Sequence, residues 1–121
     1  MKLASGVDIV EIPRVQKSIE HIGKKFLDTI YTEEEIKYCE SHKNNKYQHF
    51  AARFAAKEAL FKALSRFMNK DELSWKKFEI KNSIDGRPVV NIENKNILSI
   101  DLTMSHCKEY AVANVVVLYN E

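Results

Sequence analysis

The segment from Phe50 to Leu64 constrains this chain most, because it is predicted to be one helix with charges where a core-facing helix is normally apolar. At about 100° per residue, one face carries Phe50, Phe54, Phe61, Leu64 and Met68. Lys57 falls inside this stripe, Glu58 lies at its border, and Lys62 follows one turn later. Arg53 lies on the opposite border. Such charges must be neutralised by partners or used on a ligand, and a phosphate with its metal ion is the candidate.

The size of the chain predicts one domain over residues 1–121. With 121 residues and 45% hydrophobic content, it can form one modest core but not two independent lobes. A domain of this size leaves much of its surface exposed, so a site that needs many converging groups is often completed by another subunit. We therefore expect self-association.

Charge and cysteine content indicate an ordinary cytoplasmic protein. A net charge of +2 with 30% charged residues is far from the balance of a nucleic-acid binder. Cys39 and Cys107 lack metal-type spacing and are expected to be reduced. No basic-then-apolar leader follows Met1, and the longest uncharged run, from Tyr110 to Asn120, is too short to span a bilayer. We expect no membrane and no nucleic-acid partner.

The N-terminal part is predicted to be a strand followed by a basic helix. Residues 3–10 alternate as a strand, in which Asp8 is an acid among apolar residues. Pro13 suits the first turn of a helix that runs to about Phe26 or Leu27, because its missing N–H would be unpaired there anyway. The outer face of this helix carries Arg14, Lys17, His21, Lys24 and Lys25.

Two further helices are predicted before the strands. Thr32 and Glu35 form a capping box, so a short helix should begin there. Residues 41–46 are polar and predict a loop. The long helix follows and is predicted to end near Asn69 and Lys70.

The C-terminal half is predicted to be strands. Residues 75–82 alternate, Asp85-Gly86 is a hairpin signal, and residues 89–92 return as the partner strand. Residues 97–104 and 111–119 predict two more strands around the loop 105–109. The pattern predicts an α+β fold, with a small antiparallel sheet packed against one long and two shorter helices.

Asp8 and Glu58 are the candidate metal ligands. They lie on different elements, and one or two protein carboxylates completed by phosphate oxygens and water are typical of Mg²⁺ sites. The alternative is structural: Asp8 caps a strand end, and Glu58 pairs with Lys62 at i,i+4. Spacing alone favours that alternative.

Several residues could bind phosphate. Arg53, Lys57 and Lys62 supply positive charge, although a solvated basic face is the competing interpretation. Ser105-His106 at a strand end could bind phosphate or move a proton. Residues 86–88 are first of all a turn exit.

The basic helix from Arg14 to Lys25 could bind RNA, anionic lipid or an acidic protein, or could be a plain solvated surface. Aromatic residues are not interleaved with its charges, which counts against single-stranded nucleic acid. An acidic protein would gain encounter rate and orientation from such a face.

Four segments together resemble the holo-[acyl-carrier-protein] synthases, the short single-repeat branch of the 4′-phosphopantetheinyl transferases. They are Gly6-Val-Asp-Ile-Val-Glu-Ile12, Phe50-Ala-Ala-Arg-Phe-Ala-Ala-Lys-Glu-Ala59, Gly86-Arg-Pro88 and Met104-Ser-His-Cys-Lys-Glu-Tyr-Ala-Val-Ala113. Their order and intervals agree with the family over essentially the whole chain.

The resemblance implies transfer of the phosphopantetheine arm of coenzyme A to a serine of apo acyl carrier protein, releasing adenosine 3′,5′-bisphosphate. It implies that Asp8 and Glu58 hold Mg²⁺ against the pyrophosphate, with Glu58 or a metal-bound water as the general base. Arg53 would face the 3′-phosphate, and Lys62, also a catalytic candidate, the pyrophosphate. Lys57 belongs to the same motif. The nucleotide end would be lined by Gly86, Arg87, Pro88 and His106.

The resemblance also implies a homotrimer with sites between subunits, and a carrier protein docked on the Arg14 helix. One departure concerns the segment after the long helix, which lacks the glycine-rich loop common in the family; Arg66 is the candidate replacement for its phosphate contacts. A non-catalytic basic module that binds an acidic protein or RNA remains the alternative function, and a metal-dependent nucleotide hydrolase is a third.

Overall fold

The computed structural model describes residues 1–121 as five strands and four α-helices. The strands are β1 (Lys2–Glu11), β2 (Glu79–Asn82), β3 (Pro88–Asn91), β4 (Ile97–His106) and β5 (Tyr110–Tyr119). The helices are α1 (Ile12–Ile22), α2 (Lys24–Ile30), α3 (Glu33–Glu40) and α4 (Lys46–Leu64), with 3₁₀ turns at Lys70–Glu72 and Trp75–Lys77. The predicted α+β class is confirmed, with one more helix than expected.

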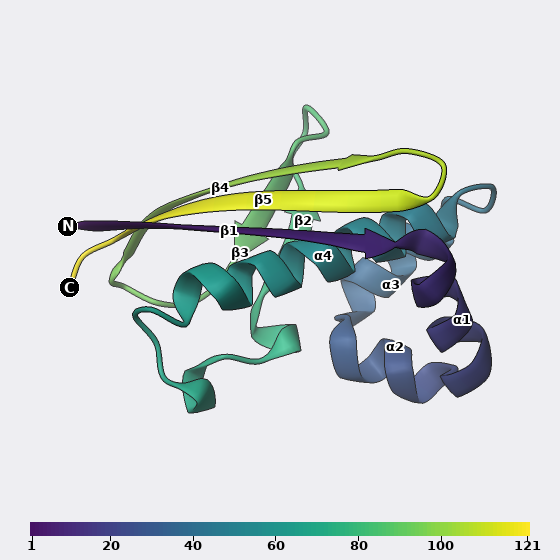
Figure 1. Ribbon diagram of the computed structural model, residues 1–121, viewed down its shortest axis with the longest axis horizontal. Coiled ribbons are helices and arrows are strands. Elements are labelled where there is room, and N and C mark those ends of the chain that lie inside the picture. Colours follow the sequence, from purple (N-terminus) through teal and green to yellow (C-terminus); the bar gives the residue numbers. More distant parts are fainter.

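The three long strands form an antiparallel sheet in the order β1-β5-β4, and β2 pairs with β3 in a separate hairpin. In Figure 1 the long strands run side by side along α4, helices α1 to α3 gather at one end, and both termini lie at the other. The register places Asp8 opposite Ala113, which in turn is opposite Met104. β1 and β4 are therefore the two edges of the sheet.

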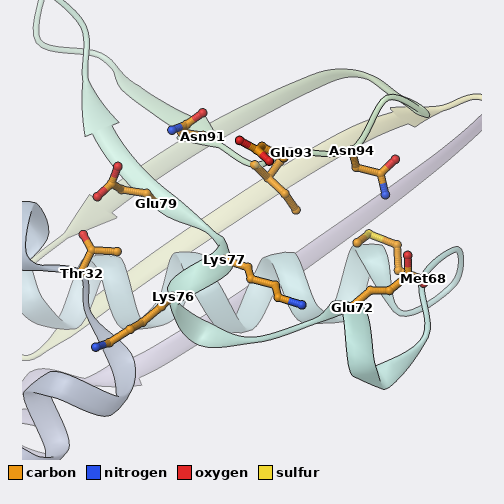
Figure 2. Close-up of a pocket in the computed structure, with 10 residues that line it drawn as sticks. Thr32, Met68, Glu72, Lys76, Lys77, Glu79, Asn91, Glu93 and Asn94 are labelled. Atoms are coloured by element: carbon orange, nitrogen blue, oxygen red, sulfur yellow. The ribbon is translucent and has the colours of Figure 1, made fainter.

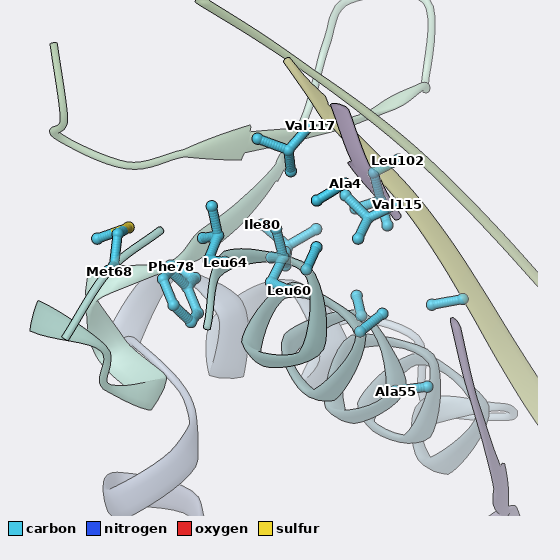
Figure 3. Close-up of a cluster of buried hydrophobic side chains, with 14 of the residues drawn as sticks. Ala4, Ala55, Leu60, Leu64, Met68, Phe78, Ile80, Leu102, Val115 and Val117 are labelled. Atoms are coloured by element: carbon cyan, nitrogen blue, oxygen red, sulfur yellow. The ribbon is translucent and has the colours of Figure 1, made fainter. Parts of the chain in front are cut away.

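Helix α4 occupies the centre of the core and is buried on more than one side. The sheet-side cluster contains four of its alanines and its two leucines together with residues of β1, β4 and β5 (Figure 3), whereas Ala51 and Ala52 pack in the second core cluster. The predicted phenylalanine face is only partly right, because Phe54 and Phe61 are half-buried and pack on Trp75 at ring-centroid distances of 5.3 and 4.9 Å. Small alanine side chains instead face the sheet and allow a close approach of the strands.

Three predicted element boundaries are wrong for identifiable reasons. The helix predicted from Pro13 to Leu27 is interrupted at Gly23, whose φ of 76° is left-handed and ends α1 before α2 begins. The long helix ends at Leu64 rather than near Asn69, because Asn69 instead caps the 3₁₀ turn that follows it. Residues 75–77 are a 3₁₀ turn, so that strand contains only residues 79–82.

Two smaller boundary differences occur at the start of α4 and at the end of β4. Lys46, predicted in a loop, begins α4, and Ser105 and His106 end β4 rather than lying in the loop. Cys39 is buried and Cys107 exposed, and neither forms a disulfide. None of the helices has the length and apolar character that crossing a membrane requires.

Candidate active site

Asp8 and Glu58 come together because β1 lies unusually close to α4. A Cβ atom on Gly6 would lie 2.0 Å from the backbone oxygen of Ala59, so only glycine fits there. Gly6 is two residues before Asp8 and shares its face of β1, and Ala59 directly follows Glu58. The glycine-x-aspartate strand and the lysine-glutamate-alanine helix are therefore one packing unit that sets the two carboxylates side by side.

The carboxylates form a charged cluster with Lys62. The Lys62 ammonium donates to Asp8 Oδ1 at 3.1 Å and to the backbone oxygen of Val7 at 2.9 Å. The side chain of Asp8 is 18% exposed and that of Lys62 54% exposed, so the cluster borders solvent. Burial raises the pKa of the Glu58 carboxyl, and the Asp8 carboxylate raises it further, whereas Lys62 lowers it. The alternative of a Glu58–Lys62 ion pair is not observed, since Lys62 bonds to Asp8 instead.

This cluster has the donor set of a magnesium site that is completed by its substrate. Repulsion by the Asp8 carboxylate adds to the effect of burial in raising the pKa of Glu58, and a divalent cation between the two carboxylates would remove that repulsion. No group of three or more His, Cys, Asp or Glu side chains could enclose a metal ion. Two carboxylates at the solvent border nevertheless fit Mg²⁺, which usually takes one or two protein carboxylates and fills its other positions with water and phosphate oxygens.

Lys57 is placed differently from its prediction as a coenzyme A ligand. Its ammonium is fully buried and donates to Glu35 Oε1 at 2.7 Å, to the Ile30 carbonyl at 2.8 Å and to the Trp75 carbonyl at 2.8 Å. An ammonium has three donors, so none is left for a phosphate. Glu35 also accepts from the backbone N–H groups of Thr32 and Ile80, at 2.8 and 2.7 Å. In this chain Lys57 joins α4 to α2, α3 and the 3₁₀ turn at Trp75, and through Glu35 to β2.

Arg53 is almost completely buried, at 2% exposure, and lines a cavity of about 230 Å³. Its Nη2 donates to Asn82 Oδ1 at 2.7 Å, and its guanidinium lies 4.4 Å from the ring centroid of Tyr38. Gly86, Pro88 and His106 line the same cavity. Four of the residues predicted to bind coenzyme A are thus brought together from α4, the β2–β3 hairpin and the end of β4.

Arg87 does not join this group. It is exposed in the turn, where its backbone N–H donates to Asp85 Oδ1 at 3.2 Å. Lys62 is also outside the cavity, in the Asp8 cluster. Arg66 is exposed in the turn after α4, which closes without any left-handed residue and so needs no glycine.

Sequence reasoning missed the neutral residues that support Arg53. Asn82 accepts from Arg53 and donates to the backbone oxygen of Gly86 at 3.1 Å, which ties the guanidinium to the hairpin turn. Tyr38, Gln48 and His49 also line the cavity. The position of Asn82 just before the Asp85-Gly86 turn was a usable signal, whereas no local pattern marked Tyr38 or His49.

The Arg53 cavity and the Asp8 cluster lie on opposite sides of α4. Arg53 and Lys62 are nine positions apart (62 − 53), which at about 100° per residue is a rotation of about 180° net. Asp8 belongs to the β1 edge of the sheet and His106 to the β4 edge. One ligand cannot contact both groups within one chain unless it passes around a buried helix.

The predicted carrier-binding residues are exposed on α1 and α2. Arg14, Lys17, His21, Lys24 and Lys25 are all exposed. The break at Gly23 divides them between two helices, and Lys24 is paired with Asp28 at 2.6 Å. Beside Arg14 lies a cavity of about 610 Å³ whose apolar lining includes Val10, Val15, Phe26 and Phe54. This surface therefore combines basic charge with an apolar hollow.

A third cavity, of about 510 Å³, contains none of the predicted site residues. Figure 2 shows it between the 3₁₀ turns and the β2–β3 hairpin, with Lys76 and Lys77 on one side and Glu79 and Glu93 on the other. Mixed charges of both signs give it no preference for an anion. It is not part of the candidate site.

Comparisons with known proteins identify the family. The family model of the 4′-phosphopantetheinyl transferase superfamily matches residues 4–115. This chain belongs to that superfamily. It is similar to the holo-[acyl-carrier-protein] synthase of Thermodesulfovibrio yellowstonii, with 46% identity over 112 residues that cover 93% of this chain and 95% of the relative.

Solved structures show the same fold. A holo-(acyl-carrier-protein) synthase from Bacillus anthracis in complex with CoA (3′,5′-ADP) superimposes with a TM-score of 0.82 at 34% identity, covering 98% of this chain and 96% of the other. The Helicobacter pylori holo-[acyl-carrier-protein] synthase in complex with coenzyme A gives a TM-score of 0.82 at 33% identity, covering 94% and 99%. The resemblance found in the sequence is confirmed.

Proposed function

We propose that this chain transfers the 4′-phosphopantetheine group of coenzyme A to a serine of apo acyl carrier protein, giving holo carrier and adenosine 3′,5′-bisphosphate. The observation that carries this proposal is the Asp8–Glu58–Lys62 cluster, which Gly6 positions at the solvent border. Relatives that cover nearly the whole chain are named holo-[acyl-carrier-protein] synthases, and two similar structures are coenzyme A complexes.

Asp8 and Glu58 are proposed to hold Mg²⁺ together with the diphosphate of coenzyme A. When bound, the ion would neutralise the diphosphate and polarise the attacked phosphorus. Lys62 would then exchange Asp8 for a phosphate oxygen, which its long and half-exposed side chain permits. The raised pKa of Glu58 moves this carboxyl towards the range of a general base for the serine proton.

Coenzyme A is proposed to bind between neighbouring subunits of a homotrimer. The diphosphate cluster and the Arg53 cavity lie on opposite sides of α4 and at opposite sheet edges, so contact of one ligand with both requires two copies of the chain. Contacts between unlike edges are head-to-tail, and such contacts form a ring when the rotation between subunits closes. The sheet face away from α4 exposes Leu3, Val7, Ile9 and Val116, an apolar patch that a ring would cover.

Subunit complementation tests this arrangement. Asp8→Ala should inactivate one half of each site, and Arg53→Ala should weaken the other half. Mixing the two variants under conditions that exchange subunits should restore activity, because some sites then combine an intact Asp8 with an intact Arg53. Mixed oligomers, verified by mass, that regain no activity would contradict a shared site.

The carrier protein is proposed to dock on the exposed surface of α1 and α2. Arg14 and Lys17 would attract acidic residues, and the apolar cavity beside Arg14 would receive an apolar side chain. Arg14→Ala should raise the KM for the carrier, with a stronger effect at low salt, and leave the KM for coenzyme A unchanged. A change confined to the coenzyme A KM would refute this placement.

The direct test of function uses an apo carrier protein, coenzyme A and Mg²⁺. Mass spectrometry should show the carrier gain one phosphopantetheine group and adenosine 3′,5′-bisphosphate accumulate in equal amount. Chelator and Asp8→Asn should each abolish the gain, while circular dichroism shows that the variant is folded. Release of phosphopantetheine without a labelled carrier would identify a hydrolase instead.

A further inference from the structure

The cavity around Arg53 differs from the two larger cavities in its charge. Its lining contains Arg53 and two histidines, His49 and His106, and no carboxylate. The remaining lining residues are neutral: Tyr38, Gln48, Ala52, Asn82, Gly86, Pro88 and Met104. The other two cavities contain glutamates. Near neutral pH, every charge that this cavity carries or can acquire is therefore positive.

Arg53 lacks the acidic partner that a buried guanidinium normally requires. No carboxylate lies within ion-pair distance of it, and its Nε has no hydrogen-bond acceptor. The neutral Asn82 oxygen and the Tyr38 ring are its principal partners. Burying a charge without a counterion is costly, so the arrangement is that of a site whose counterion arrives with the ligand.

We propose that His49 completes this anion site with Arg53 and His106, and that it holds a phosphomonoester group by a charge-assisted hydrogen bond. The inference rests on the proposed function, since coenzyme A brings such a group as its 3′-phosphate. His49 lies outside the sequence segments that carry the family resemblance. It would make this chain's discrimination between coenzyme A and its dephosphorylated form dependent on pH.

The surroundings of His49 keep its imidazole neutral while the cavity is empty. Tyr38 and His42 face it from α3 and the turn that follows, with ring-centroid distances of 5.6 and 4.0 Å, Arg53 lies one turn along α4, and His106 approaches from β4. Burial lowers the pKa of His49 to about 4, and His42, Arg53 and His106 add to this effect. A phosphate dianion placed among these groups would raise the pKa of His49 and so favour the charged imidazolium. Binding of the phosphomonoester should therefore take up a proton.

Calorimetry on the full-length protein tests this inference. Adenosine 3′,5′-bisphosphate and adenosine 5′-monophosphate would be titrated at about pH 6.5, just above the second phosphate pKa of about 6, in two buffers of different ionisation enthalpy. The bisphosphate should take up more protons than the monophosphate. Its affinity should fall about threefold to tenfold between about pH 6.5 and about pH 8, as expected for an average uptake of about one third to two thirds of a proton over this range.

Two substitutions at position 49 and one control decide the outcome. His49→Gln should abolish the extra proton uptake and flatten the pH dependence. His49→Lys, a permanent cation, should keep the affinity but take up no proton. Gln48→Ala alters the same cavity wall without removing a titratable group and should retain the uptake. Equal proton uptake by the wild type and by folded His49→Gln would overturn the inference.

The two proposals fail in distinguishable ways. If the wild-type chain does not label an apo carrier, the proposed function fails whatever the nucleotide titrations show. If the wild type labels the carrier, but its bisphosphate binding takes up no extra proton or the uptake is independent of His49, only the present inference fails.

Discussion

Replacing Lys57 with methionine should destabilise the protein strongly. The substitution keeps most of the side-chain volume but removes three hydrogen bonds of 2.7 to 2.8 Å from a fully buried ammonium. It leaves the Glu35 carboxylate buried with only the backbone N–H groups of Thr32 and Ile80 as donors. Loss of one partner from a buried pair costs about 3–5 kcal/mol.

The measurement is urea unfolding at a fixed protein concentration, because the proposed oligomerisation would make apparent stability depend on concentration. For a domain of this size the loss corresponds to a fall in Tm of about 10–20 °C. Glu35→Gln combined with Lys57→Met removes both charges. The double variant should therefore lose less stability than the sum of the losses measured for the two single variants.

Lys62→Met is the matched control, since Lys62 lies on the same helix but its ammonium is half-exposed. It should change stability by less than about 1 kcal/mol and should raise the KM for coenzyme A. The opposite pattern would refute this division of roles: Lys57→Met with unchanged stability and a coenzyme A KM raised about tenfold, or about 1.4 kcal/mol in binding, would place Lys57 at the ligand.

Three further predictions concern the contact between Gly6 and α4, the loss of stability at acid pH, and the N-cap of α3. Gly6→Ala should lower the free energy of unfolding by about 1–3 kcal/mol through overpacking against Ala59. It should also reduce the rate of phosphopantetheine transfer by more than its loss of Tm explains. Unchanged kinetics would show that the contact does not position Asp8. The folded-state pKa of His49, about 4, lies below its unfolded value of 6.5, so the unfolded chain binds more protons between these values and stability should fall as the pH drops from 6.5 to 4. His49→Gln should remove about 1 kcal/mol of this fall, after allowance for partial exposure. Parallel pH–stability curves for the wild type and the variant would contradict this. Thr32→Ala should cost about 0.5–2 kcal/mol in thermal unfolding, since the Glu35 N–H loses its acceptor at 3.2 Å, and a neutral effect would show that the cap is dispensable.

Local patterns predicted much of the secondary structure, whereas the joint role of Asp8 and Glu58 was expected from the family resemblance. The Thr32–Glu35 capping box begins α3 as expected, with both of its hydrogen bonds formed. Errors occurred where one glycine or one polar residue outweighs periodicity, as at Gly23, where a left-handed residue divides the predicted helix. Periodicity also treated α4 as one-sided, whereas alanines on its other faces are buried against the sheet.

The sequence by itself determined which residue types are available and which of them share a strand or a helix face. That was enough to name Asp8, Glu58, Lys62 and Arg53 as candidates, because a charge in an apolar strand, or along a helix face that should be apolar, can be recognised without coordinates. Only the tertiary structure decided that Lys57 is paired with the Glu35 carboxylate whereas Arg53 has only neutral partners. Helical spacing states which way a side chain points, but its partners come from segments such as Ile30, Trp75 and Asn82, whose positions depend on the packing of the whole chain.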